Sequence, residues 1–122
     1  MTEYIEPEQA LAALDEIGFH VRDAGLLFSA LARPAATAFG DDAYPGLEAK
    51  TAALLESLTR NHPLFDGNKR FAWYMTLAFL RLNGYRLDIE TDTAFDLVVG
   101  VAAGRIGLED SAARIARHLT PR

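Results

Sequence analysis

The chain has 122 residues, half of them hydrophobic, with a formal net charge of −5 and a pI near 5.1. This length and composition predict a single domain over residues 1–122 with a hydrophobic core of its own. The acidic balance argues against binding of a nucleic-acid backbone, because Lys69 and Arg70 are the only adjacent cations.

The same composition bears on where the protein works. No cysteine occurs, which excludes disulfides, thiolate catalysis and cysteine-based zinc sites and favours a cytoplasmic protein. Residues 1–8 include three glutamates and no apolar run, unlike a secretory signal. No later stretch approaches the ~20 apolar residues that span a bilayer. We therefore expect neither secretion nor membrane insertion.

Apolar residues recur at helical spacing along most of the chain. Pro7 predicts the first turn of a helix that ends at Gly18. The apolar face of this helix comprises Ala10, Leu11, Leu14 and Ile17. Asp23 predicts the cap of a second helix, which Pro34 stops because the residue before a proline avoids the helical conformation. The apolar stripe of this second helix comprises Leu26, Leu27, Ala30 and Leu31.

Residues 35–46 predict a loop or flap, because they contain two glycines, a proline and the adjacent acids Asp41 and Asp42. We expect these two acids to be solvated. A third helix is predicted from residue 47 to residue 60. Its buried face comprises Leu54, Leu55 and Leu58.

The next helix starts after Gly67 and stops at Gly84. It is apolar on nearly every side, which is typical of a helix at the centre of a bundle, and we expect Trp73 and Tyr74 to lie in the core. The residues that carry this pattern are Phe71, Tyr74, Met75, Leu77, Ala78, Phe79, Leu80 and Leu82. Residues 85–89 alternate between apolar and charged, but are too few to indicate a sheet.

Two further helices complete the prediction. Asp92 predicts the cap of a helix that runs to Ala103, and Gly107 precedes the last helix. The apolar stripe of the first comprises Phe95, Val98, Val99 and Ala102, and that of the second comprises Ala112, Ile115, Ala116 and Leu119. The sequence thus predicts an all-α fold, a bundle of about six helices around a central apolar helix.

Functional side chains concentrate between Arg60 and Arg70, directly before the predicted central helix. Gly67 permits a tight turn there, and the free amides at the start of the helix, with the positive end of its dipole, bind phosphate readily. Lys69 and Arg70 add positive charge, and Asn68 adds a side-chain donor. This combination predicts a site that holds the phosphates of a nucleotide.

Two more residues of this stretch suggest the chemistry. Asp66 has the type of ligand that a hard divalent ion such as magnesium prefers. His62 can accept a proton at neutral pH, so it is placed to activate a nucleophile. A base beside a metal and phosphate site indicates group transfer from a nucleotide to a hydroxyl. The alternative is ordinary turn chemistry, but a connector between two helices does not need so many functional side chains.

Residues 62–70 read HPLFDGNKR, which resembles the signature of the Fic/Doc (Fido) superfamily, and specifically of its death-on-curing (Doc) branch. The family pattern is His, two or three residues, an acid, Gly or Ala, Asn, Gly or Lys, and Arg. Members with Gly after the Asn generally transfer AMP, whereas the Doc toxin has Lys there and is a kinase. This chain has Lys69, and it has Trp73 where AMP-transferring members place a second arginine. Further resemblance in residues 22–34, 39–45 and 79–84 extends over nearly the full chain.

The resemblance implies a toxin of a toxin–antitoxin system that uses ATP and Mg²⁺. Such a toxin phosphorylates a threonine or serine of a translation factor, as Doc does with elongation factor Tu, and so inhibits translation. It also implies a small cognate antitoxin as partner, and residues 35–46 fall where relatives hold a flap that docks the target's backbone. Two alternatives remain open, namely a Fic-type AMP transferase and a catalytically inert Fido interaction module.

The resemblance also implies a role for each matching residue. His62 would be the catalytic base, Asp66 the Mg²⁺ ligand, and Gly67 the residue that opens the anion hole. The phosphate contacts would be Arg60, Asn68, Lys69 and Arg70. In one departure, Leu64 stands where many members have Phe, and we expect Leu64 to keep that burial. Arg22 and Asp23 are expected to form either a helix cap with an exposed charge or a brace beneath the active-site loop.

Overall fold

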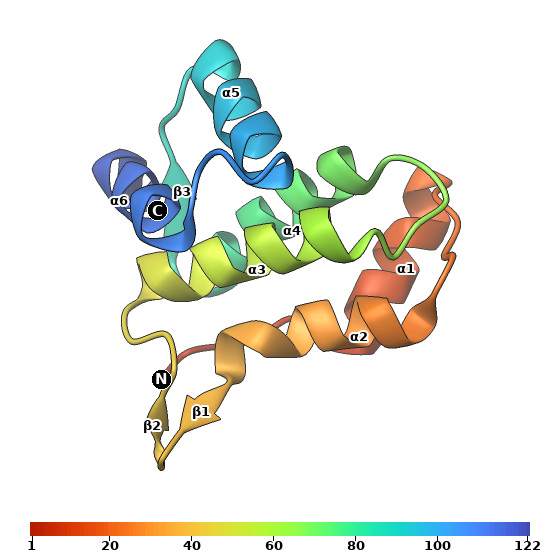
Figure 1. The fold of residues 1–122 in the computed structure, drawn as a ribbon, viewed down its shortest axis with the longest axis horizontal. Coiled ribbons are helices and arrows are strands. Elements are labelled where there is room, and N and C mark those ends of the chain that lie inside the picture. Colours follow the sequence, from red (N-terminus) through yellow and green to blue (C-terminus); the bar gives the residue numbers. More distant parts are fainter.

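Six α-helices make up most of the computed structural model, which describes residues 1–122 (Figure 1). The helices are α1 (Pro7–Ile17), α2 (Ala24–Ala32), α3 (Leu47–Asn61), α4 (Asn68–Leu82), α5 (Thr91–Ala102) and α6 (Leu108–His118). The other elements are a 3-10 helix, η1 (Arg33–Ala35), and the strands β1 (Thr37–Ala38), β2 (Asp41–Asp42), β3 (Tyr85–Leu87) and β4 (Leu119–Pro121). The predicted mainly helical fold is therefore confirmed. None of the helices has the length and apolar character needed to cross a membrane.

Local sequence signals set the ends of the first two helices as predicted. Pro7 occupies the first turn of α1, and Gly18 ends it in the left-handed conformation, with φ of 92°. The Asp23 carboxylate accepts a hydrogen bond from the backbone N–H of Leu26 at 3.0 Å and so caps α2. The helix α2 ends at Ala32, and Pro34 lies within the tighter η1 turn that follows it.

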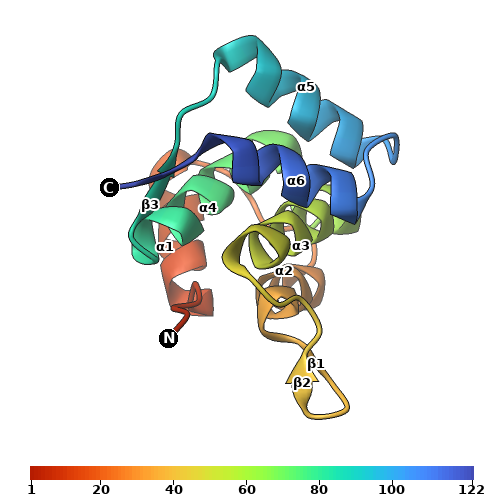
Figure 2. The same ribbon diagram turned by 90° about the vertical axis from the view of Figure 1, so that its left-hand side faces the viewer.

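The centre of the molecule is shared by α3 and α4 (Figure 2). Nine of the 15 residues of α3 are buried, against six of 15 in α4, so α3 is the more enclosed of the two. Ala52 and Ala53 have no exposed surface, and such small side chains let α2, α4, α5 and α6 approach α3. The prediction that Tyr74 is a core residue is wrong, because 42% of it is exposed.

The fifth helix is rotated relative to the prediction. Its cap is Glu90 rather than Asp92, which lies in the first turn. The residues buried on α5 are Ala94, Leu97, Val98, Gly100 and Val101. Phe95 lies one position away from this face and is 66% exposed, because consecutive helical residues point about 100° apart. A large aromatic side chain therefore stands at the surface of α5.

The extended piece after α4 belongs to a sheet that the sequence did not indicate. β3 pairs antiparallel with β4, with Arg86 opposite Thr120. Leu119, predicted on the last helix, therefore belongs to a strand. Asp88 follows β3 and accepts hydrogen bonds from Arg86 and from the Thr120 hydroxyl. The hydrogen bonds from Arg86, which have the larger effect, and the bond from Thr120 hold the pKa of the Asp88 carboxyl below its usual range.

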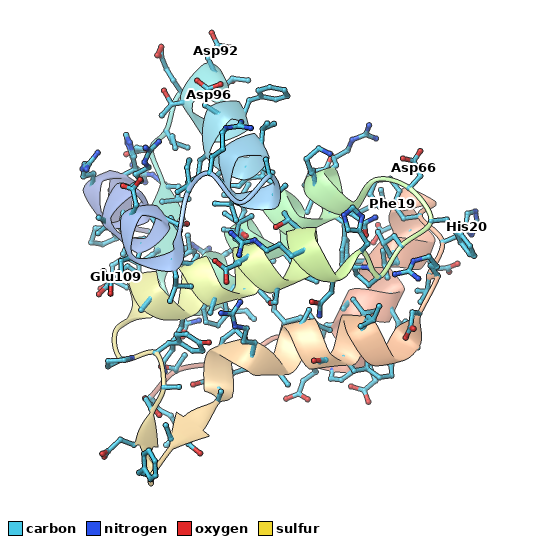
Figure 3. All side chains as sticks on the ribbon, viewed as in Figure 1. Phe19, His20, Asp66, Asp92, Asp96 and Glu109 are labelled. Atoms are coloured by element: carbon cyan, nitrogen blue, oxygen red, sulfur yellow. The ribbon has the colours of Figure 1, made fainter.

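Residues 35–46 form a short hairpin, β1 and β2, at the amino-terminal end of α3. The loop or flap predicted for these residues is therefore a hairpin, and it lies away from the active-site loop. That loop follows the opposite end of α3, a helix about 22 Å long at ~1.5 Å per residue, and Figures 1 and 3 show the hairpin and Asp66 at opposite ends of the molecule. Asp42 is not simply solvated, because it pairs at 3.0 Å with the ammonium group of Lys50, whose side chain is only 4% exposed.

We predict that Phe79→Ala lowers the free energy of unfolding by about 3–5 kcal/mol, because it leaves a cavity in the core. Phe79 is 1% exposed and stacks against Tyr4. Phe39→Ala is the matched control, since Phe39 is fully exposed at the hairpin tip, and it should change stability by less than about 0.5 kcal/mol. Urea denaturation of both variants measures the difference, and equal losses would contradict this packing.

We also predict a pH dependence that comes from Asp88. A carboxyl whose pKa is lowered by folding stabilises the fold above its unfolded-state pKa, and this contribution is lost as the pH falls through the folded pKa. Asp88→Asn should therefore flatten the dependence of melting temperature on pH below about pH 4. Phe39→Ala, a control at a fully exposed residue that does not titrate, should leave the curve unchanged. Identical curves for wild type and Asp88→Asn would refute the prediction.

Candidate active site

The connection between α3 and α4 opens onto a cavity of about 790 Å³. Its polar end is lined by His62, Asp66, Gly67, Asn68, Lys69 and Arg70. Its other end is apolar and is formed by side chains of α4, β3 and α5, including Trp73, Leu77, Leu87, Phe95 and Val98. The structure thus brings six of the predicted site residues together at one end of an elongated, largely apolar cavity.

His62 ends α3 in a left-handed backbone conformation, with φ of 50° and ψ of 56°. Residues other than glycine are uncommon in this conformation, which costs of the order of 1 kcal/mol or more. The left-handed turn reverses the chain away from α3, and the exposed imidazole lines the cavity. The imidazole of His62 therefore belongs to a residue with a strained backbone conformation.

Asn68 closes the loop that follows His62. Its Oδ1 accepts from the backbone N–H of Leu64 at 2.9 Å, and its Nδ2 donates to the carbonyl of Leu64 at 3.0 Å. The same Nδ2 lies 3.4 Å from Nδ1 of His62, a long contact that restrains the ring without fixing its tautomer. Asn68 was expected to contact phosphate with its side chain, but that side chain holds the loop together. Leu64 is 1% exposed, so its predicted burial is confirmed.

Gly67 makes the turn into α4. Its φ of 79° suits glycine, and a Cβ at this position would lie 2.7 Å from the ring of Phe19. The backbone N–H groups of Asn68, Lys69 and Arg70 make no hydrogen bond within the protein, since they occupy the first turn of α4. Three free donors at the positive end of a helix dipole therefore point toward the cavity's polar end.

Lys69 and Arg70 are exposed beside these donors and form no ion pair. The Arg70 guanidinium lies over the ring of Phe19, 5.6 Å from its centroid, which restrains the long side chain by a cation–π contact. The positive charge of both residues is therefore free to meet an anion.

Asp66 supplies the carboxylate of the polar end. Its Oδ1 accepts from the backbone N–H of Gly67 at 2.9 Å, and no cluster of three His, Cys, Asp or Glu side chains occurs in the molecule. A single carboxylate is too little for a zinc or calcium site made by protein alone. It fits Mg²⁺, which commonly binds through one or two carboxylates together with the phosphates of a substrate.

Arg60 does not reach the cavity, although it was expected to bind phosphate. Its Nε donates to the carbonyl of Val101 at 3.1 Å, and its Nη2 lies 3.5 Å from the carbonyl of Ile106. Its Nη1 pairs with Glu56 at 3.5 Å. The side chain of Arg60 thus ties the end of α3 to the turn between α5 and α6.

The connection between α1 and α2, residues 18–23, lies across the active-site loop, and we call this segment the strap. The backbone N–H of Phe65 donates to the carbonyl of His20 at 3.1 Å. Both Arg22 and Asp23 donate backbone N–H groups to the carbonyl of Pro63, at 2.7 and 3.0 Å. Figure 3 shows Phe19 and His20 of the strap at the same end of the molecule as Asp66.

The sequence predicted roles for two residues of the strap, Arg22 and Asp23, but not for Phe19. Both roles considered for Arg22 and Asp23 are realised, because Asp23 caps α2 and Arg22 donates side-chain hydrogen bonds to the loop. Phe19 was not predicted at all. Its only signal is an aromatic residue directly after the glycine that ends α1, which does not reveal that its ring would pack against Gly67 and Arg70.

Comparison with known proteins gives two findings. The family model described as the Fic/DOC family matches residues 4–80. The chain is also similar to a protein named Toxin Doc from Mycolicibacterium smegmatis (strain ATCC 700084 / mc(2)155). The two are 50% identical over an aligned length of 122 residues, and the match covers 95% of this chain and 93% of that protein.

We predict that Gly67→Ala lowers the free energy of unfolding by about 1–3 kcal/mol through backbone strain, with a further loss from the contact with Phe19. Phe19→Ala removes that contact, so the loss in the double variant should be smaller than the sum of the two single losses. Urea denaturation of the four proteins measures this coupling. Additive losses would show that the ring does not pack on Gly67.

Proposed function

The chain belongs to the Fic/DOC family, in its Doc branch, and on this basis we propose that it is a toxin that transfers the terminal phosphate of ATP to a protein hydroxyl. Members of this family are enzymes that modify proteins. The hydroxyl belongs to a threonine or serine of a translation factor similar to elongation factor Tu, and its modification inhibits translation.

One observation carries the proposal most strongly, namely that His62 and the free amides of α4 share one end of the cavity. The amides of Asn68, Lys69 and Arg70 can donate to the oxygens of a phosphate, while the charges of Lys69 and Arg70 offset its negative charge. An imidazole next to a bound phosphate can take the proton from an incoming hydroxyl. Binding and base catalysis are therefore possible in a single complex.

The reaction consists of one displacement at phosphorus. The imidazole of His62 accepts the proton of the target hydroxyl, whose oxygen forms a bond to the terminal phosphorus of ATP. The bond between that phosphorus and the bridging oxygen breaks, and ADP leaves with its electron pair. Lys69, Arg70 and the helix amides stabilise the charge on the transferred group and on ADP.

Asp66 is the residue that would hold Mg²⁺, and the ion when bound neutralises charge on the phosphates. The Asp66 carboxylate accepts one hydrogen bond from Gly67 through Oδ1, so its Oδ2 has no partner in the protein. This oxygen is therefore available to a cation that is also held by the nucleotide.

We propose a cytoplasmic protein whose partner is a small antitoxin. This follows from the similarity to a protein named as a toxin and from the absence of cysteine. An antitoxin of this kind would neutralise the toxin by folding a disordered tail onto its helical surface. The net charge of −5 gives no support for direct binding of nucleic acid.

Phosphate transfer is favoured over AMP transfer by two positions. Lys69 follows Asn68 where AMP-transferring relatives have Gly, and Trp73 replaces their second arginine. We predict that elongation factor Tu gains label from [γ-³²P]ATP and none from [α-³²P]ATP when it is incubated with the protein and Mg²⁺. Transfer of the α label alone would replace the kinase proposal by AMP transfer. Lys69→Gly should weaken phosphate transfer, because it removes a charge beside the phosphates.

We further predict that expression of the protein alone arrests bacterial growth and that His62→Ala relieves the arrest, because it removes the base. His20→Ala is the matched control, since the His20 side chain makes no hydrogen bond and does not line the cavity. It should leave the arrest in place. Arrest that persists in His62→Ala would support an inert interaction module instead.

A further inference from the structure

We propose that Arg22 is a positioning residue for His62, because its guanidinium holds the backbone turn that directs the imidazole into the cavity. This inference rests on the proposed function, in which His62 is the base. Arg22 lies 40 residues before His62 in the sequence and does not line the cavity. Any effect of Arg22 on the reaction therefore has to pass through the loop.

The side-chain hydrogen bonds of Arg22 are all with the end of α3. Its Nε donates to the carbonyl of His62 at 2.9 Å, and its Nη2 donates to the same carbonyl at 2.5 Å. The same Nη2 lies 3.3 Å from the carbonyl of Asn61. The last carbonyls of a helix have no partner within it. Arg22 satisfies two of them and places a positive charge at the negative end of the α3 dipole.

The charge of Arg22 is not used elsewhere. Arg22 takes part in none of the five ion pairs of the molecule. Its backbone is fixed independently, because its N–H donates to the carbonyl of Pro63 at 2.7 Å. Arg22 is thus attached to the loop twice, through its guanidinium at His62 and through its backbone N–H at Pro63.

We call these hydrogen bonds from the Arg22 guanidinium the clamp. The left-handed conformation of His62 explains why the clamp is needed. A residue other than glycine leaves this region readily unless its surroundings hold it there. A change of φ to the usual negative range would turn the Cβ of His62, and the imidazole would leave its position 3.4 Å from the Asn68 amide. We therefore expect Arg22 to affect the chemical step and not the binding of ATP.

The test compares Arg22→Ala and Arg22→Lys with Arg117→Ala, a control at an exposed arginine whose side chain makes no hydrogen bond or ion pair. Transfer from [γ-³²P]ATP to purified elongation factor Tu gives kcat and the KM for ATP. Arg22→Ala should lower kcat roughly 10- to 100-fold, the effect of a misplaced catalytic group, with KM unchanged. Arg22→Lys should fall in between, because an ammonium group cannot donate to both carbonyls in the same geometry.

Two further measurements separate positioning from a general loss of structure. Millimolar guanidinium should restore part of the kcat of Arg22→Ala, and thermal unfolding should show that the variant remains folded at the assay temperature. An unchanged kcat in Arg22→Ala, or an equal loss in Arg117→Ala, would overturn the inference. If Arg22→Ala does not fold, Arg22→Lys decides, and wild-type kcat in that variant also overturns it.

A third measurement does not depend on the reaction. In a nuclear magnetic resonance spectrum of histidine-labelled protein, the chemical shifts of the His62 imidazole should change in Arg22→Ala and stay the same in Arg117→Ala. If wild-type protein transfers no phosphate, the proposed function fails while this spectrum still tests the clamp. If the wild type is active and the His62 signals do not move, the clamp fails alone.

Discussion

The left-handed turn at His62 is the constraint on which the rest of the site depends. It ends α3, reverses the chain and directs an imidazole toward the start of α4. A residue other than glycine is uncommon in this conformation, so other parts of the molecule have to hold it. The strap supplies the backbone bonds to Pro63 and Phe65 and the guanidinium of Arg22, and Asn68 closes the loop from the other side. The strap and Asn68 therefore hold the active-site loop in this conformation.

The cavity joins two kinds of surface, and this division suits the nucleotide and the protein target of the proposed reaction. Its polar end has free amides and two unpaired cations, which suit phosphate. Its other end is apolar and includes the exposed Phe95 of α5. Arg60 contributes indirectly, because it ties the end of α3 to α5 and to the turn after α5. The residue thus supports the site without contacting it.

Features that depend on neighbouring residues in the chain could be predicted from the sequence. Pro7 and Gly18 mark helix ends through their backbone preferences, and Asp23 marks one through its side-chain hydrogen bond. The residues from His62 to Arg70 line one end of the cavity because they follow one another around a single turn. Features that depend on distant segments could not. The pairing of β3 with β4, the position of the hairpin and the contacts of Arg60 join parts of the chain that no local pattern relates. For Arg22 the sequence suggested a brace beneath the loop but not the carbonyls that it contacts.

In the proposed reaction, His62 and the first turn of α4 face the same phosphate. A crystal structure of the protein with a non-hydrolysable ATP analogue and Mg²⁺ is the decisive experiment. Phosphate oxygens should lie on the amides of Asn68, Lys69 and Arg70, with the imidazole of His62 on the side of the terminal phosphate from which a hydroxyl approaches. A triphosphate bound away from the start of α4, or an imidazole turned out of the cavity, would contradict it.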